Sequence, residues 1–237
     1  MSSAQPEILR VPASRAHADH LRQLHVELSS LSPVGRYLIY DDDAFVDYLE
    51  SVLDDPSHLF TQTADGEAFS HLRVIGDVIF LNNIFVTERS RGYGVGRALL
   101  RESIRSLRGE QQQFMELDAF ASNPLAVGWY ARLGFAEQSR VNWLDLGKPR
   151  KAISNAAFTP DQNGFTQILA DGARAGTLVG SRALLSDVSA FHLLGTDRVA
   201  SAVARVSNDR GGSESPVLET SLRLRAPIET VLEKLHS

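Results

Sequence analysis

Apolar positions in the first third of the chain follow helical and strand spacings in turn. A short apolar run at Ile8 to Val11 predicts a first strand. After Ser14, apolar residues recur at helical spacing as far as Leu31, so we expect Ser14 to cap an amphipathic helix. A second stripe predicts another helix, with Asp41, Asp42 or Asp43 as its cap; its apolar positions are Phe45, Leu49, Val52 and Leu53.

Three strand-like runs come next, at 58–64, 67–75 and 78–86. Asp65-Gly66 and Gly76-Asp77 separate them, and such pairs favour tight antiparallel hairpins. A glycine-rich turn, a helix at 95–107, a strand at 114–120, a helix from residue 123 and a strand at 135–146 complete the order. The pattern therefore predicts an α/β (α+β) fold in which helices flank a mixed, mostly antiparallel central sheet.

The glycine-rich turn has the features of an anion site. The apolar strand that ends at Val86 runs into Gly92, Gly94 and Gly96 and then into a helix. Glycines let the backbone turn tightly and approach a ligand, while the first unpaired amides of a helix favour negative charge. Arg91 and Arg97 would add positive charge, and phosphate is the expected guest.

Spacing separates the phosphate-binding motifs that such a turn could represent. A Walker-type loop would need Lys followed by Ser or Thr, whereas this chain has Arg97 and Ala98. A dinucleotide fingerprint would need wider glycine spacing and an acidic residue after the next strand, and Asp118 alone could serve. A surface turn with helix-capping glycines is the bland alternative.

A second segment, NPLAVGWYARLGF, begins and ends like a short helix. Asn123 is placed to cap it, with Pro124 at the first helical position, and Gly134 is placed as a left-handed C-cap before a strand that begins at Phe135. Trp129 and Tyr130 fit a reading as ordinary core aromatics on its inner face.

Together the two segments resemble the GNAT superfamily of N-acyltransferases. RGYGVG fits that superfamily's acetyl-coenzyme A loop, and 123–135 is similar to its fourth helix and following strand, so the resemblance covers roughly residues 5 to 147. It implies the GNAT acyl-CoA N-acyltransferase fold with acetyl-CoA as cosubstrate. It also implies that the coenzyme lies against Phe85, Val86, Arg91, Gly92, Tyr93, Gly94, Val95, Gly96, Arg97 and Asn123.

The same resemblance implies direct attack of a free amine on the acetyl carbonyl, with Tyr130 protonating the departing thiolate and no acyl-enzyme. Many relatives place a Glu on the strand before the loop, where this chain has Phe80, Asn82 and Asn83. Alternative bases are Glu88, His71, Glu116 and Asp118. The missing Glu keeps open a second function, a regulatory or interaction protein that binds acetyl-CoA without turnover.

The acceptor is expected to be an amine, either a small molecule or a protein amine. In this fold the loop between the first two helices borders the acceptor site, and here it carries Tyr37, Tyr40 and the Asp41–Asp43 run. That run could attract a cationic amine, or it could simply cap the next helix.

Composition narrows the remaining choices. The 237 residues include no Cys, so disulfides and thiolate metal sites are excluded, and we expect no metal cofactor. A net charge of −5 argues against nucleic-acid binding. No signal pattern or membrane-length apolar run is present, so we expect a cytoplasmic protein that does not enter a membrane.

The chain changes character after residue 147. We expect an acetyltransferase domain at 1–147, a linker at 148–162 and a small β-rich module with a terminal helix at 163–237, too short to be a second complete acetyltransferase. Runs at 165–172, 176–185, 190–195, 199–207 and 217–225 predict its strands, and 209–215 predicts an exposed turn. The module could form a homodimer contact, a lid over the acceptor site or a cap on the sheet.

Overall fold

The computed structural model describes residues 6–207 and 215–236. In that part of the chain twelve strands form one sheet in the order β1-β2-β3-β4-β5-β12-β6-β11-β10-β9-β8-β7. The strands are β1 (Ile8–Arg10), β2 (His58–Thr63), β3 (Ala68–Ile75), β4 (Val78–Val86), β5 (Phe114–Phe120), β6 (Ala136–Gly147), β7 (Ala157–Pro160), β8 (Thr166–Ala170), β9 (Ala173–Val179), β10 (Arg182–Leu185), β11 (Ser201–Ser207) and β12 (Val217–Pro227).

Five α-helices flank this sheet: α1 (Arg15–Ser29), α2 (Ala44–Leu53), α3 (Val95–Leu107), α4 (Pro124–Arg132) and α5 (Ile228–His236). Ser14 accepts from the His17 amide at the start of α1, and Asn123 accepts from the Ala126 amide at the start of α4, as the sequence predicted. At α2 the capping bond runs from the Ala44 amide to Asp42 Oδ1, at 2.9 Å. The predicted fold class is confirmed.

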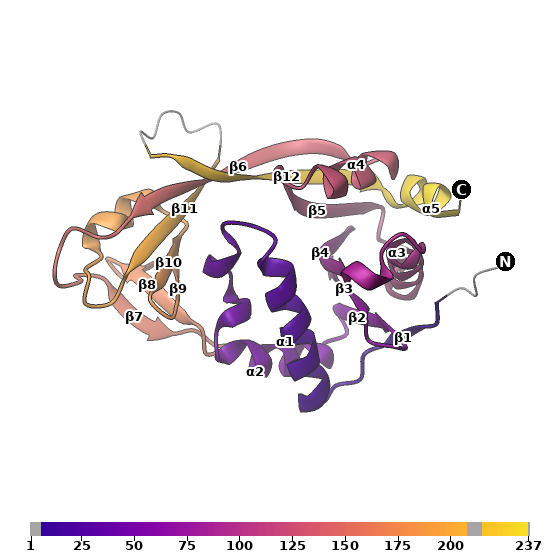
Figure 1. Ribbon diagram of the computed structural model, residues 1–237, viewed down its shortest axis with the longest axis horizontal. Coiled ribbons are helices and arrows are strands. Elements are labelled where there is room, and N and C mark those ends of the chain that lie inside the picture. Colours follow the sequence, from indigo (N-terminus) through magenta and orange to yellow (C-terminus); the bar gives the residue numbers. More distant parts are fainter. Residues whose placement is uncertain (1–5, 208–214, 237) are drawn as a thin grey trace.

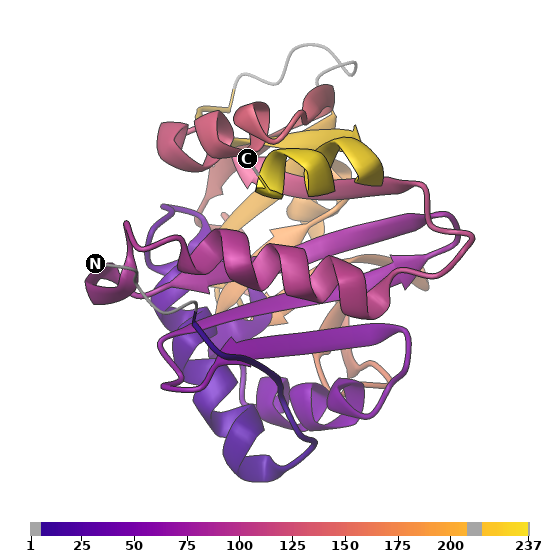
Figure 2. The ribbon, with the colours of Figure 1, turned by 90° about the vertical axis from the view of Figure 1, so that its right-hand side faces the viewer.

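The sheet curves strongly (Figure 1). Helices α1 and α2 lie in its concavity, between β1–β4 on one side and β7–β10 on the other, with β6 and β12 arching over them. Viewed from the side, α3 and α5 lie next to each other on the outer face (Figure 2), and Arg97 of α3 donates to the carbonyl of Lys234 in α5 at 2.8 Å.

Two hydrophobic cores sit on opposite faces of the N-terminal strands. On the concave face Phe60, Phe69 and Phe85 pack against α1 and α2. On the outer face Met115 and Leu117 of β5 pack with α3, α4 and α5. Because side chains alternate along a strand, Phe85 enters the first core while Ile84 and Val86 face α3.

The expected domain division does not describe this sheet. The strand that ends at Gly147 was expected to complete the N-terminal sheet, but β12 lies between β5 and β6. Leu224 of β12 stands opposite Leu117 of β5, and the apolar face of α5 joins the outer core. The C-terminal strand and helix are therefore part of the N-terminal half of the sheet, and residues 148–216 form an insertion between β6 and β12.

The insertion also differs in detail from its predicted elements. The expected linker contains β7, and the run at 176–185 divides at Gly180 into β9 and β10. The run at 190–195 is mostly the 3₁₀ helix η4 (Val188–Leu193), because the Asp187 carboxylate caps it through the Ser189 amide. The predicted turn at 209–215 lies almost wholly outside the described residues.

The two ends of the sheet share one pairing pattern. From β1 to β5 the pairs run antiparallel, antiparallel, antiparallel and parallel, and β12 then adds antiparallel to β5. From β7 to β11 the same sequence of pairings recurs, and β6 adds antiparallel to β11. The insertion therefore repeats the strand topology of the N-terminal half, without the helices between its first and second strands.

No helix within residues 6–207 and 215–236 is long and apolar enough to span a membrane.

Candidate active site

A gap opens in the sheet between β4 and β5. These parallel strands pair from Val78–Phe114 to Leu81–Leu117, and their pairing ends there. Beyond it β4 continues to Val86 and keeps its pairing with β3 alone. The backbone of β4 from Asn82 to Val86 therefore presents a sheet edge on the side of β5, which an extended ligand can pair with as a strand would.

The glycine-rich turn lies at the end of this edge. Gly92 and Gly94 have φ values of +84° and +78°, a region that other residues rarely adopt. Gly94 caps α3, and the helix's first backbone bond is donated by Ala98 to the Gly94 carbonyl at 3.0 Å. The preceding amides of the turn are free of helical bonds, and open space surrounds the α-carbons of Gly92 and Gly94. This geometry suits a phosphate group.

The structure brings most of the predicted coenzyme residues together at this point. Arg91 reaches back along β4, and its Nε donates to the Val86 carbonyl at 2.9 Å. Tyr93 is 73% exposed at the tip of the turn, while Val95 is buried beneath it. Gly96 lies next to the end of β4, where a Cβ would be in ordinary van der Waals contact with Val86 Cγ2 at 3.7 Å.

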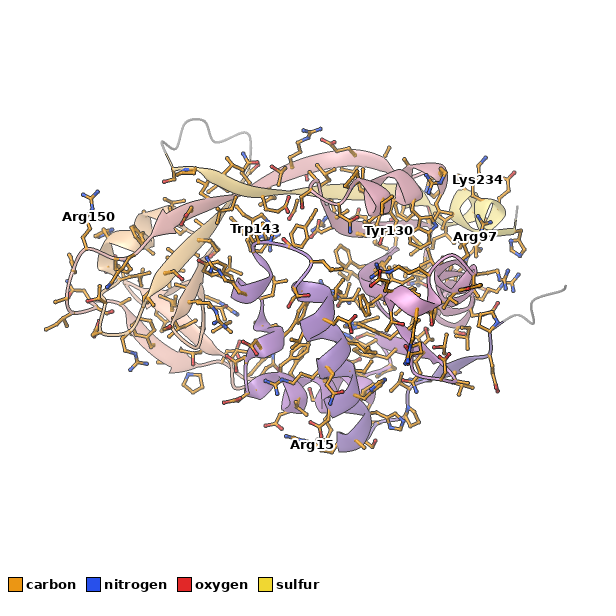
Figure 3. The ribbon with its side chains drawn as sticks, in the orientation of Figure 1. Arg15, Arg97, Tyr130, Trp143, Arg150 and Lys234 are labelled. Carbon is orange, nitrogen blue, oxygen red and sulfur yellow. The ribbon has the colours of Figure 1, made fainter. Side chains whose placement is uncertain are left out.

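Arg97 is the exception among these residues. Its guanidinium points away from the turn and donates to the carbonyl of Lys234 near the end of α5 (Figure 3). The side chain therefore ties α3 to the C-terminal helix, and only the backbone of Arg97 remains available to an anion at the turn.

Tyr130 lies on the other side of the gap, on α4. Its side chain is 7% exposed and packs between Trp129 and Phe135, with ring centroids 5.1 and 5.6 Å away. Burial raises the pKa of Tyr130 above its ordinary value, so the hydroxyl stays protonated at neutral pH. Asn123 caps this helix, which makes it a residue that positions Tyr130.

A cavity of about 270 Å³ connects the gap to the concave face. Its walls come from α1 and the segment after it, from the diverging ends of β4 and β5, from α4, and from three strands of the C-terminal part. Its lining includes Tyr40, Asn82, Asn83, Asp118, Phe120, Asn123, Tyr130, Trp143, Arg205 and Ser221.

Among the four alternative bases, Asp118 lines this cavity, and its Oδ2 accepts from Arg223 at 2.9 Å. Glu88 is exposed on the short helix η3 (Glu88–Ser90), and Glu116 pairs with Arg225 at 2.8 Å. His71 is 5% exposed, and burial lowers its pKa well below the ordinary value. Its Nε2 lies 2.8 Å from His58 Nδ1 and 3.2 Å from Asn82 Nδ2, so it contacts the cavity wall through Asn82.

Asn83 fixes a second polar group in the cavity. Its Nδ2 donates to the Tyr40 hydroxyl at 3.0 Å, which leaves the hydroxyl proton of Tyr40 free to point elsewhere. His25 supports this pair from below and lies 1% exposed, with Nδ1 2.8 Å from the Leu21 carbonyl. Burial lowers the pKa of His25 to about 4, so it is neutral at physiological pH.

The loop between the first two helices borders the cavity, as expected, but two of its three aspartates are engaged. Asp41 pairs with Arg182 of β10 at 3.1 Å, and Asp42 caps α2. Arg182 also donates to the Arg36 carbonyl at 2.7 Å. The C-terminal half thus holds this loop against the cavity through Arg182.

The cavity also contains Trp143, Arg205 and Ser221, which no sequence motif assigned to the site. They come from β6, β11 and β12, and Trp143 Nε1 donates to Ser221 Oγ at 2.7 Å although 78 positions separate them in sequence. Ordinary strand alternation precedes each of them, and no local motif marks their approach.

The C-terminal half has no equivalent gap among its described residues. Its parallel pair, β10 and β11, stays in register from Arg182–Ser201 to Leu185–Ala204, which is the whole of β10. A loop capped by Asp187 and the short helix η4 follow β10 in place of a glycine turn and a long helix. Among the described residues, a sheet gap and a glycine turn therefore occur together only beside β4 and β5.

Solved structures of similar shape are acetyltransferases. A tandem GNAT protein from the clavulanic acid biosynthesis pathway superposes with a TM-score of 0.66 at 13% identity, over 93% of this chain and 98% of that one. A putative acetyltransferase from Pyrococcus horikoshii gives 0.63 at 10% identity, over 98% and 92%. A GCN5-related N-acetyltransferase from Sphaerobacter thermophilus gives 0.59 at 13%, over 95% and 97%.

Sequence comparison leads to the same group. An uncharacterized N-acetyltransferase of Methanocaldococcus jannaschii is 34% identical over 73 residues, which are 30% of this chain and 32% of the relative's length. The model of the Acetyltransferase (GNAT) family matches residues 10–135, which contain the glycine turn, the sheet gap and Tyr130. The chain therefore belongs to the GNAT acetyltransferase family.

Proposed function

We propose that this protein transfers an acetyl group from acetyl-CoA to a primary amine by direct attack within a ternary complex. One observation carries the proposal: a glycine turn suited to phosphate and the buried, protonated hydroxyl of Tyr130 lie at the same gap in the sheet. The turn would bind a phosphate-bearing acyl donor, and Tyr130 would be the acid for its leaving group.

In this proposal the amides that follow Arg91 hold the pyrophosphate, helped by the positive end of the α3 dipole. The free edge of β4 from Asn82 to Val86 hydrogen-bonds the pantetheine arm. The Val86 carbonyl becomes available when Arg91 releases it and turns toward the phosphates.

Tyr130 supplies the proton that the leaving thiolate needs. Since burial raises its pKa, the hydroxyl keeps its proton until negative charge develops on sulfur beside it. The acceptor nitrogen must arrive neutral, because an ammonium has no lone pair with which to attack. Asn82, Asn83 and the Tyr40 hydroxyl are the polar groups placed to orient it, or a water beside it.

The amides at 82 and 83 also favour a second function, an acetyl-CoA sensor without turnover, because neither side chain can accept a proton. Release of free thiol in the presence of a panel of amines separates the two functions. Sustained release with at least one amine supports the transferase. Tight acetyl-CoA binding with no release above background for any amine supports the sensor.

Gly94→Asp tests the phosphate site directly. The variant places a carboxylate at the turn and should abolish acetyl-CoA binding measured by calorimetry. Gly76→Asp is a matched control, since Gly76 also has positive φ (+61°) and open space around it but lies in the β3–β4 hairpin. Unchanged affinity in a folded Gly94→Asp protein would contradict the proposed phosphate site.

A further inference from the structure

The far wall of the cavity carries a cation that nothing in the coenzyme chemistry uses. Arg205 of β11 lines the same cavity as Tyr130 but belongs to the C-terminal half of the sheet. Its guanidinium lies over the ring of Trp143, 5.1 Å from the ring centroid. Arg205 and Trp143 are direct partners across β11 and β6, so both side chains stand on the concave face.

Trp143 is a rigid support for this cation. Its side chain is 3% exposed, its Nε1 donates to Ser221 Oγ, and Phe120 packs edge-on against it at 6.1 Å. A guanidinium that rests on such a fixed ring has lost part of its side-chain freedom before any ligand arrives. Arg205 is thus held ready at the cavity wall.

Arg205 differs in its partners from three other arginines of the concave face. Arg182, Arg223 and Arg225 each form an ion pair with a carboxylate. Within residues 6–207 and 215–236 no carboxylate lies within 4.0 Å of the Arg205 side chain. A guanidinium can donate two parallel hydrogen bonds to a carboxylate or phosphate, and here that capacity is unused.

Glu219 lies in the same row of the sheet as Arg205, since it stands opposite Trp143 on the other side of β6. Its carboxylate is buried and accepts from the Thr220 amide at 2.9 Å, from the Ser122 amide at 3.3 Å and from the Ser122 hydroxyl. Trp143 lies between Glu219 and Arg205 in this row. The Glu219 carboxylate is bound by its own donors, and the Arg205 guanidinium remains available to a ligand in the cavity. Asp118, the acidic residue of the lining, is already paired with Arg223.

We infer that the acceptor amine carries an anionic group, a carboxylate or a phosphate, which Arg205 binds while the amine reaches the gap beside Tyr130. This inference rests on the proposed function, because it names the acceptor class of the same cavity. The C-terminal half then serves the reaction as the wall that selects the acceptor.

Pairs of amines that differ in the presence of an anionic group provide the test. ω-Amino acids are compared with their primary carboxamides, and phosphoethanolamine with ethanolamine, so that the two arms separate carboxylate from phosphate. For the wild-type protein kcat/KM from thiol release should favour the anionic member of at least one pair. In Arg205→Gln that preference should fall by about ten- to a hundredfold, the usual scale for a charge-assisted hydrogen bond.

Arg198→Gln is the matched control, because Arg198 also rests on an aromatic ring, that of Phe158 at 4.9 Å, but does not line the cavity. It should keep the wild-type preference. A wild-type protein that does not distinguish the paired amines, or an Arg205→Gln protein that keeps the full preference, would overturn the inference while leaving amine acetylation itself established.

A binding readout keeps the inference testable if no amine is turned over. The chain has two Trp residues, and Trp143 lies beneath Arg205, so an anionic amine at this site should change the intrinsic fluorescence. We expect a saturable change with the carboxylate-bearing or phosphate-bearing amine, absent in Arg205→Gln and retained in Arg198→Gln. The same change in both variants, or none in the wild type, would refute anion binding at Arg205, whatever the fate of the transferase proposal.

Discussion

The position of β12 makes a sharp prediction about stability. Leu224 is 5% exposed and stands opposite Leu117 of β5, within the core that α3 and α4 share. Truncation of a buried Leu to Ala costs about 2–5 kcal/mol. Domains typically have a free energy of unfolding of about 5–15 kcal/mol, so Leu224→Ala should remove a large part of the stability of the N-terminal half.

Hydrogen exchange measured by mass spectrometry reports this loss strand by strand. Amides of β4, β5 and α3 that exchange through global opening should do so about thirtyfold to a few thousandfold faster in Leu224→Ala. Ile153→Ala is the control, because Ile153 is 71% exposed and its truncation should leave these rates unchanged. Unaltered exchange of β4 and β5 in Leu224→Ala would refute the placement of β12 in the N-terminal sheet.

A protein that ends at Lys148 sharpens the same argument, since it lacks both β12 and α5. The large apolar side chains lost with them are at most 7% exposed: Leu222, Leu224, Ile228, Val231 and Leu235. At about 1.5–3 kcal/mol each, their burial contributes roughly 7–15 kcal/mol, as much as the whole protein's expected stability. We therefore expect the fragment not to fold. A folded fragment that binds acetyl-CoA would restore a domain boundary near residue 147.

Further predictions concern catalysis, the acceptor loop and pH. Tyr130→Phe should lower turnover by about a hundredfold with acetyl-CoA affinity nearly unchanged. Tyr48→Phe is the control and should match the wild type, because Tyr48 lies away from the cavity. Equal turnover in both variants would show that another group donates the proton. Arg182→Gln should raise the acceptor KM several-fold without changing the Kd for acetyl-CoA, because the substitution frees the loop that Arg182 holds at Arg36 and Asp41. A changed acetyl-CoA Kd with a constant acceptor KM would contradict this prediction. The pKa of His25 is about 4 in the folded protein, against an ordinary value of 6.5, so His25 binds a proton in the unfolded chain first as the pH falls. About 3 kcal/mol of the free energy of unfolding should therefore be lost between pH 6.5 and 4. Urea unfolding at several pH values should show this slope in the wild type and a flatter one in His25→Gln.

The N-terminal half could be predicted because its information is local. Ser14 and Asn123 mark helix starts through bonds to amides three residues away, and the hairpins at 65–66 and 76–77 join strands that are neighbours in sequence. The glycine turn likewise lies between the strand and the helix that it connects. Short-range patterns of this kind are sufficient to order β1 through α4.

Strands of the C-terminal half pair with segments that are distant in sequence, and their hydrophobic patterns do not indicate which segments these are. β6 and β12 alternate in the same way, so either strand could have completed the sheet beside β5. What distinguishes them is side-chain pairing across long separations, such as Arg223 with Asp118, 105 positions apart. The four residues of β7 are too few for a clear period, and for the same reason the acceptor wall at Trp143 and Arg205 was not foreseen.

The pairing of β6 and β12 explains how the C-terminal half can contribute to the cavity of the N-terminal half. β6 follows the N-terminal strands in sequence but also pairs with β11, while β12 follows the insertion in sequence but pairs with β5. Neither half has a complete sheet without the other, so the repeated topology forms one curved surface with β6 and β12 at its centre. That curvature brings β10 and β11 over the loop after α1, where Arg182 holds the loop and Arg205 faces the cavity. β10 and β11 stay paired, and η4 rather than a glycine turn follows β10, so the described residues of the C-terminal half offer no second gap of this kind. Its intact strands instead provide a rigid wall opposite Tyr130, at the place where an acceptor must be held.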